Sequence, residues 1–240
     1  MVALTTGLHP KTGVGGQTGG VDIVDRLTTL VARLRAGPVG VALGALVAAV
    51  MAACWTTTFD RTDVPQPNHR FFDLNAEQSL AVVVSVGILF LAAAAAFAWS
   101  RRGDGGRPVL GLVAFLVFMA VEEGAFLHER LESRLDVDWQ ILYLPVIAVG
   151  AWLWLRSLAR LPRPWPAALL VLGAVSWALS QVFEALQWKG ERLVHVWMLF
   201  PEEVGEMVGS ALFALAFLAA LQVRTARPGR GRPGRGTAPT

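Results

Sequence analysis

The sequence predicts an all-α protein: a polytopic transmembrane helical bundle of six spans with both termini in the cytoplasm. Hydrophobic residues fill 54% of the 240 positions and charged residues only 16%, whereas a soluble domain carries about 25% charged residues. The apolar residues also form long blocks, which a hydrocarbon layer of about 30 Å requires of a helix. This composition excludes a disordered chain, a coiled coil and an ordinary soluble enzyme.

Each apolar block is expected to form one membrane-spanning helix. The first block begins beyond residue 35, so it is expected to act as a signal anchor and not as a cleaved secretory peptide. The expected spans are 37–55, 78–99, 108–127, 140–155, 167–183 and 204–222, and an apolar approach at 194–200 precedes the sixth.

Basic residues set the expected orientation. Most of them lie before the first span and after the second, fourth and sixth, which the positive-inside rule assigns to the cytoplasm. We therefore expect a multi-pass protein of the bacterial inner membrane with both termini inside. Its expected parts are a mostly disordered N-terminal segment (1–36), a six-helix domain (37–222) and a disordered tail rich in Arg, Pro and Gly (223–240).

Two glutamates lie deep in the third span. Glu122 and Glu123 follow Pro108 by fourteen and fifteen residues, which places them roughly 21–23 Å along a helix, in the outer third of the bilayer. Carboxylates near a helix C-terminus oppose the helix dipole, so a capping role explains them poorly.

The fifth span carries a stripe of small and polar residues that ends in an acid. These residues recur at steps of three or four, so they share one helix face, which in lipid must point into the bundle or a wet cavity. The stripe consists of Gly173, Ser176, Ser180, Glu184 and Gln187.

The sixth span opens with three more glutamates. Pro201 followed by Glu202 and Glu203 is an ordinary helix start, but Glu206 lies one turn deeper. If the helix instead begins near residue 194, Pro201 would break it and His195 would lie on the face of Glu202.

The six glutamates are expected at similar depth. So many carboxylates in a layer of low dielectric constant must be protonated, paired with cations or bound to metal. We predict a divalent metal (iron, manganese or zinc), with retained protons as the alternative. The chain lacks the Glu-x-x-His and His-Glu-x-x-His patterns. The candidate metal ligands are Glu122, Glu123, His128, Glu184, Glu202, Glu203, Glu206 and His195, and the candidate catalytic residues are Glu123, Glu184 and Glu206.

Four segments resemble a family of uncharacterised six-span bacterial membrane proteins. They are Phe72-Asp73-Leu74-Asn75-Ala76-Glu77, Glu122-Glu123 with His128-Glu129, Glu184, and Glu202-Glu203 with Glu206-Met207 and Gly209. The chain departs from the family at Glu122, where the family has Asp, and at Ser79-Leu80-Ala81, where a turn with Pro and Trp is usual. The resemblance covers 71–222 and implies a fold but no function.

Cys54 and the tryptophans inside the spans each allow two interpretations. Met51-Ala52-Ala53-Cys54 resembles a lipoprotein cleavage box, but Cys54 also suits an apolar membrane helix. Trp152, Trp154 and Trp177 either line a pocket or pack against lipid.

The residues favour an intramembrane metal-binding protein or metalloenzyme that acts on a lipid-like or isoprenoid substrate. A proton- or cation-coupled transporter is the main alternative, since both halves carry an acidic pair in their third span. An acid-initiated isoprenoid cyclase without metal, and a purely structural role, are further alternatives. The expected partners are the lipid bilayer and a lipid-like small molecule, without nucleic acid, and the oligomeric state stays open.

Overall fold

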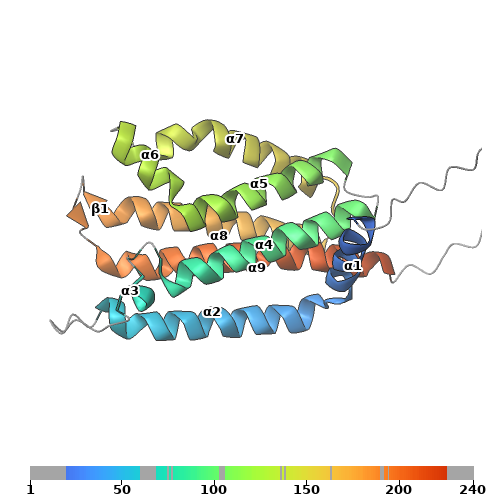
Figure 1. Cartoon of the computed structure of the whole chain (residues 1–240), viewed down its shortest axis with the longest axis horizontal. Helices are drawn as coiled ribbons and strands as arrows, with labels where there is room; N and C mark the ends of the chain where they lie inside the picture. The colour runs from blue at the N-terminus through green and yellow to red at the C-terminus, as the bar shows by residue number, and fades with distance from the viewer. Residues whose placement is uncertain are drawn as a thin grey trace, which may run out of the picture.

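Six long helices lie side by side and form the body of the protein (Figure 1). The computed structural model describes residues 20–59, 69–74, 76, 78–102, 106–135, 137, 139–162, 164–189, 192–193 and 195–225. All six helices are long and apolar enough to cross a membrane. The predicted fold class, an all-α bundle of six spans, is therefore confirmed. The long helices are α2 (Ala36–Phe59), α4 (Leu80–Arg101), α5 (Gly106–Ala125), α7 (Trp139–Leu158), α8 (Trp165–Gln187) and α9 (Leu199–Thr225).

Short elements cover the two ends of the bundle. At one end lie α3 (His69–Phe72), α6 (Leu127–Leu135) and a hairpin of β1 (Trp188–Lys189) and β2 (Arg192–Leu193), in which Trp188 pairs with Leu193. We call this the hairpin end. Helix α1 (Gly20–Arg33) marks the opposite end (Figure 1).

The start of α9 differs from its prediction. A 3₁₀ turn at Val196–Met198 leads into α9 at Leu199, five residues before the expected start of the sixth span. The alternative start near residue 194 is wrong. Pro201 lies in the first turn of the helix, where its missing N–H removes no helical hydrogen bond, so the helix is not broken there.

Helices α8 and α9 form the most closely packed pair. A Cβ at Gly173 would lie 2.9 Å from the Gly209 carbonyl oxygen, and a Cβ at Gly205 would lie 3.0 Å from the Ser180 Cβ. The Ser176 hydroxyl donates a 2.8 Å hydrogen bond to the Gly205 carbonyl. Small residues thus let the two backbones meet, as in other membrane helix pairs.

Two hydrophobic clusters fill the rest of the bundle. The larger one, toward the α1 end, joins α4, α5, α8 and α9 around Trp99, Leu170 and Phe217. The second joins α2 and α4 to α9 and includes Cys54, whose side chain is fully buried. Cys54 is thus a core residue of α2.

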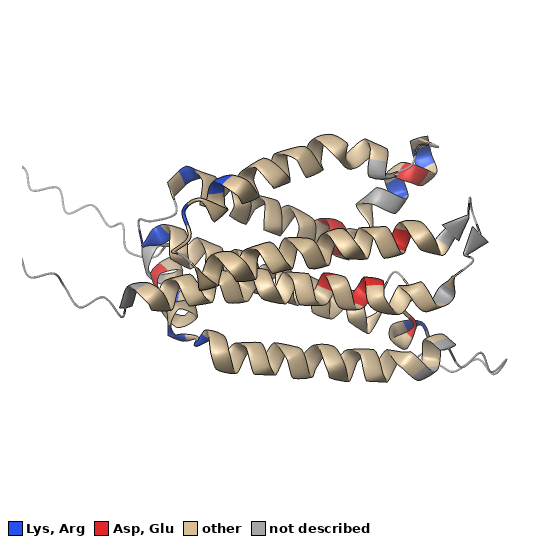
Figure 2. Cartoon of the chain, turned by 180° about the vertical axis from the view of Figure 1, so that it is seen from behind, with Lys and Arg blue, Asp and Glu red and all other residues tan. Residues whose placement is uncertain are grey.

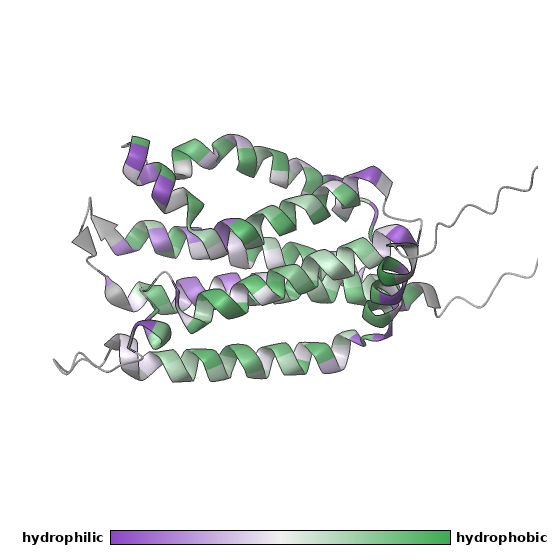
Figure 3. Ribbon diagram, in the orientation of Figure 1, coloured by the Kyte–Doolittle hydropathy of each residue, from purple (hydrophilic) through white to green (hydrophobic). Residues whose placement is uncertain are grey.

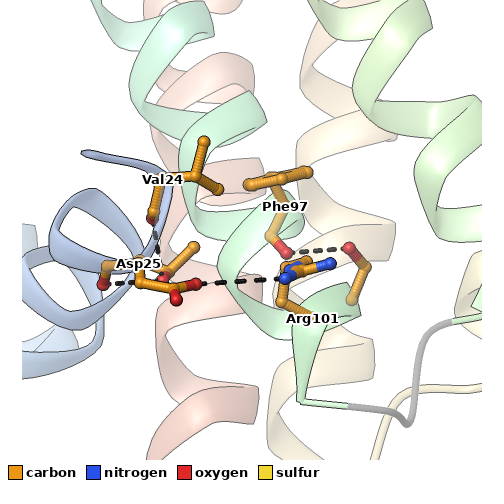
Figure 4. A network of polar contacts seen from close by, with 6 residues as sticks. Val24, Asp25, Phe97 and Arg101 are labelled. Carbon is orange, nitrogen blue, oxygen red and sulfur yellow. Dashed lines mark hydrogen bonds and ion pairs between the residues drawn. The ribbon is translucent and has the colours of Figure 1, made fainter. Parts of the chain in front are cut away.

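Helix α1 was not predicted, because its 14 residues are too few to span a membrane. It packs against α4, and Asp25 approaches Arg101 at 3.9 Å (Figure 4). Its outward face exposes Ile23, Leu27 and Leu30. We predicted disorder for most of 1–36 and for 223–240, but Gly20–Arg33 is helical and α9 continues to Thr225. The remaining parts of these predictions, at 1–19 and 226–240, lie outside the described residues.

Charged and polar residues are distributed unevenly between the two ends of the bundle. Figure 2 shows acidic residues on inner helices toward the hairpin end, while Lys and Arg gather mainly at the α1 end and on α6. Figure 3 shows mostly hydrophobic long helices beside a hydrophilic α6. The acids inside the bundle therefore stand out against apolar surroundings.

Candidate functional site

A cavity of about 590 Å³ opens among α4, α5, α7, α8 and α9. All six predicted glutamates line it: Glu122, Glu123, Glu184, Glu202, Glu203 and Glu206. They lie at the last turns of α5 and α8 and the first turns of α9, so the cavity is acidic at the hairpin end.

The end of α5 places the first pair of glutamates. Glu122 is buried, and the Tyr143 side chain of α7 lies within hydrogen-bonding reach of it. Phe126 then adopts a φ of 53°, a conformation that costs a residue with a side chain about 1–3 kcal/mol. This residue ends α5, turns the chain into α6 and adds its buried ring to the cavity wall.

Two glutamines of α8 bind glutamates of α9. The Gln187 amide donates to Glu202, and the Gln181 amide lies 3.5 Å from the Glu206 carboxylate, at the long limit of a hydrogen bond. The hairpin makes this pairing possible because it folds the start of α9 back beside the end of α8, with the His195 amide donating to the Gln187 carbonyl. These contacts fix the carboxylates on the α9 side of the cavity.

Glu203 differs from its neighbours. Its side chain is 9% exposed, and its Oε2 atom has no hydrogen-bond partner among the described residues. An unpartnered buried carboxylate oxygen destabilises a fold, so its presence in the cavity wall points to a ligand-facing role.

The acidic end of the cavity has no basic residue in its described wall. Of the described residues that line the cavity, none is a lysine, an arginine or a histidine. Glu206 lies within electrostatic range of Glu123, Glu184, Glu202 and Glu203. Such a set of carboxylates attracts protons, metal ions or organic cations.

Toward the α1 end the cavity is apolar. Its wall there is made of Leu112, Phe115, Trp154, Leu170 and Phe217. Leu170 and Glu184 are fourteen residues apart on α8, so the cavity extends about 21 Å along that helix. It is therefore a long site with one acidic end.

The stripe predicted for the fifth span is confirmed. Gly173 and Ser176 face α9, Ser180 and Gln187 are buried, and Glu184 lines the cavity. Of the three tryptophans, Trp154 and Trp177 line the cavity, whereas Trp152 is 53% exposed and lies beneath Arg156.

The predicted histidines do not join the glutamates in the described structure. His195 is exposed beside Trp197 and is absent from the described cavity wall. The backbone of His128 belongs to α6, but its side chain lies outside the described residues. Within the part of the chain that is described, no three His, Cys, Asp or Glu side chains are close enough to hold a metal ion.

The sequence reasoning missed Tyr143 and Gln181 as site residues. Tyr143 is the one tyrosine of the chain and lies in a span without a polar stripe. Gln181 follows Ser180 directly and so lies beside the predicted stripe, not on it. The only indication in the sequence was that each is an isolated polar residue in an apolar span. Such a residue could have been expected to face an acid of another helix.

Comparisons with known proteins give a family and no activity. A family model described as a domain of unknown function (DUF8692) matches residues 39–221. The chain matches no curated protein and no solved structure.

Proposed function

The chain belongs to the DUF8692 family, and we propose that it binds a lipid-like substrate with one apolar chain inside the membrane. The glutamates of the cavity then act on the polar end of that substrate. One observation carries this proposal: a single cavity joins six carboxylates to a long apolar wall.

The dimensions of the cavity support a lipid-like substrate with an extended apolar chain. A volume of about 590 Å³ lies within the range of about 300–1,000 Å³ typical of small-molecule sites. Its length of about 21 Å along α8 and its largely apolar wall suit an extended hydrocarbon chain.

The carboxylates supply acid–base chemistry at the polar end. Glu123, Glu184 and Glu206 come from three different helices and line the same space, so they can approach one substrate group from three sides. A carboxyl group in an apolar setting is suited to donate or accept a proton. We keep these three residues as the candidate catalytic set.

A divalent metal remains part of the proposal. Because the described cavity wall offers carboxylates and no imidazole, a hard cation such as manganese suits it better than zinc or iron. The carboxylates would have to move closer together to bind it, since the described side chains do not form a metal cluster. Metal content is therefore measured together with substrate.

Transport is less well supported. A transporter needs a route to both sides of the membrane, and the α1 end of the described bundle is filled by the cluster around Trp99, Leu170 and Phe217. The cavity wall near that cluster is apolar and offers no polar path for an ion. An acid-initiated isoprenoid cyclase is a further alternative, in which a protonated glutamate of the same cavity would start the reaction.

The decisive experiment combines lipid extraction with elemental analysis. The protein is purified in lipid nanodiscs without a histidine tag, alongside Glu184→Ala and Glu206→Ala, with the exposed Glu132→Ala of α6 as the control. Wild type and control should retain a single-chain amphiphile, about one per chain, and both cavity variants should lose it. Wild-type protein that carries neither a small molecule nor a metal contradicts the proposal.

We also propose that the protein lies in the bacterial inner membrane with both termini in the cytoplasm. The test uses Cys54→Ala protein with one new cysteine, at Thr29 of α1 or Ser133 of α6. In intact cells a reagent that does not cross the membrane should label the cysteine at 133 and spare the one at 29. The reverse pattern would overturn the orientation.

A further inference from the structure

The cavity has an open side between α7 and α8. Helix α7 packs against α5 and α6, but its backbone makes almost no close approach to that of α8. Its contacts with α5 are tight, since a Cβ at Gly150 would lie 2.3 Å from the Phe115 ring. Helix α7 therefore lies at the edge of the bundle (Figure 1) and leaves a gap on its α8 side.

Three residues form the rim of this gap. Ile147 and Ala151 of α7 and Ala178 of α8 line the cavity and are at the same time exposed on the protein surface. Toward the α1 end the gap is closed by the Trp154 indole, which donates a 3.3 Å hydrogen bond to the Leu170 carbonyl. The cavity thus reaches the surface through an apolar window, which we call the α7–α8 window.

The window lies at the level of the lipid chains. Ala151 follows the start of α7, at the hairpin end, by twelve residues, and Ala178 follows the start of α8, at the α1 end, by thirteen. Counted from these opposite ends, each residue lies about 18–20 Å along its helix. That is near the middle of a hydrocarbon layer about 30 Å thick. A molecule that passes this window comes from the lipid, not from water.

The charge of the cavity indicates the head group. Glu203 presents a buried carboxylate oxygen without a hydrogen-bond partner among the described residues, and Glu206 lies near it in the same wall. A protonated amine can donate a charge-assisted hydrogen bond to such an oxygen, whereas an anionic head cannot. Aromatic rings at Tyr143 and Trp177 add surfaces that favour a cation.

We infer that a single-chain amphiphile with an amine head enters the cavity sideways from the bilayer, through the α7–α8 window. This inference rests on the proposed function, because it takes the cavity to be the substrate site. It adds the route of entry and the charge of the head group. The hydrocarbon chain of the amphiphile must pass between Ile147, Ala151 and Ala178.

The test places bulk in the window. Ala151→Trp and Ala178→Trp add a large side chain to the rim. Ala148→Trp and Ala185→Trp are the matched controls, since both alanines are exposed on the same helices but absent from the described cavity wall. The probe is a spin-labelled long-chain alkylamine in nanodiscs, and electron paramagnetic resonance measures the immobilised fraction. The fatty acid of equal chain length is the second probe.

Wild type and both controls should immobilise the amine, and the rim variants should lower its apparent affinity by about tenfold or more, which is about 1.4 kcal/mol. The fatty acid should stay mobile throughout. Rim variants that hold the amine as wild type does would overturn the route, and equal retention of the fatty acid would overturn the head-group assignment. If wild type immobilises neither probe, the proposed function itself fails, which is a distinct result.

Discussion

The close approach of α8 and α9 gives a prediction whose size can be worked out from the structure. A Cβ at Gly209 would lie 2.3 Å from Trp177 Cδ1 and 2.9 Å from the Gly173 carbonyl oxygen. The Trp177 indole cannot simply turn away, because its Nε1 donates a 3.1 Å hydrogen bond to Ser210. Gly209→Ala should therefore push the two helices apart.

The expected cost follows from two opposing terms. Alanine is favoured over glycine in a helix by about 0.8–1.0 kcal/mol, whereas forcing an extra carbon into a well-packed contact costs about 1–3 kcal/mol. Because one of the two clashes involves backbone, the second term should dominate. We expect Gly209→Ala to lower the free energy of unfolding by up to about 2 kcal/mol.

Gly87→Ala is the matched control for this measurement. Gly87 lies within α4, and a Cβ there would meet no atom within 4 Å. That substitution should be neutral or stabilising by up to about 1 kcal/mol. Thermal unfolding of both variants in one detergent separates them, since 1 kcal/mol shifts the midpoint by about 2–4 °C for a chain of this size. A Gly209→Ala protein as stable as the Gly87→Ala protein refutes the reasoning.

Three further predictions concern other contacts. Ser176→Ala removes the donor to the Gly205 carbonyl and should lower the free energy of unfolding by about 0.6 kcal/mol, the mean for hydrogen bonds between membrane helices, as measured by reversible unfolding in detergent. Glu203→Met removes a buried carboxylate whose Oε2 atom has no hydrogen-bond partner among the described residues, and it should raise the unfolding temperature while weakening retention of the alkylamine probe; a lower unfolding temperature contradicts it. Asp25→Asn breaks an exposed ion pair with Arg101 and should change stability by less than about 1 kcal/mol, with a larger loss showing that α1 is held mainly by this pair.

The spans could be predicted because their signal is local. A block of apolar residues fixes a membrane helix wherever its neighbours lie, and all six blocks form helices at or near the expected positions. The stripe on the fifth span was equally local, since Ser176 and Ser180 share a face by spacing alone. Both predictions needed no knowledge of which helices touch.

The cavity could not be predicted, because it depends on which helix faces which. Tyr143 approaches Glu122 only since α7 packs on α5, and nothing in either span indicates that pairing. For His195 the same lack of information on helix contacts gave a site residue that the described cavity wall does not contain. His195 seemed close to Glu202 in sequence, but the turn that precedes α9 leaves it exposed.

The acidic cavity and the α8–α9 contact depend on each other. Glutamates gathered in one space repel one another, so the helices that carry them need strong packing elsewhere to stay together. The glycine and serine contacts around Gly173 and Gly205 supply that packing on the side of α8 that faces α9. The other side of the cavity has no such contact, because α7 barely touches α8. Substitutions in the α8–α9 contact should therefore change stability and binding together, whereas substitutions at the α7–α8 window should change binding alone.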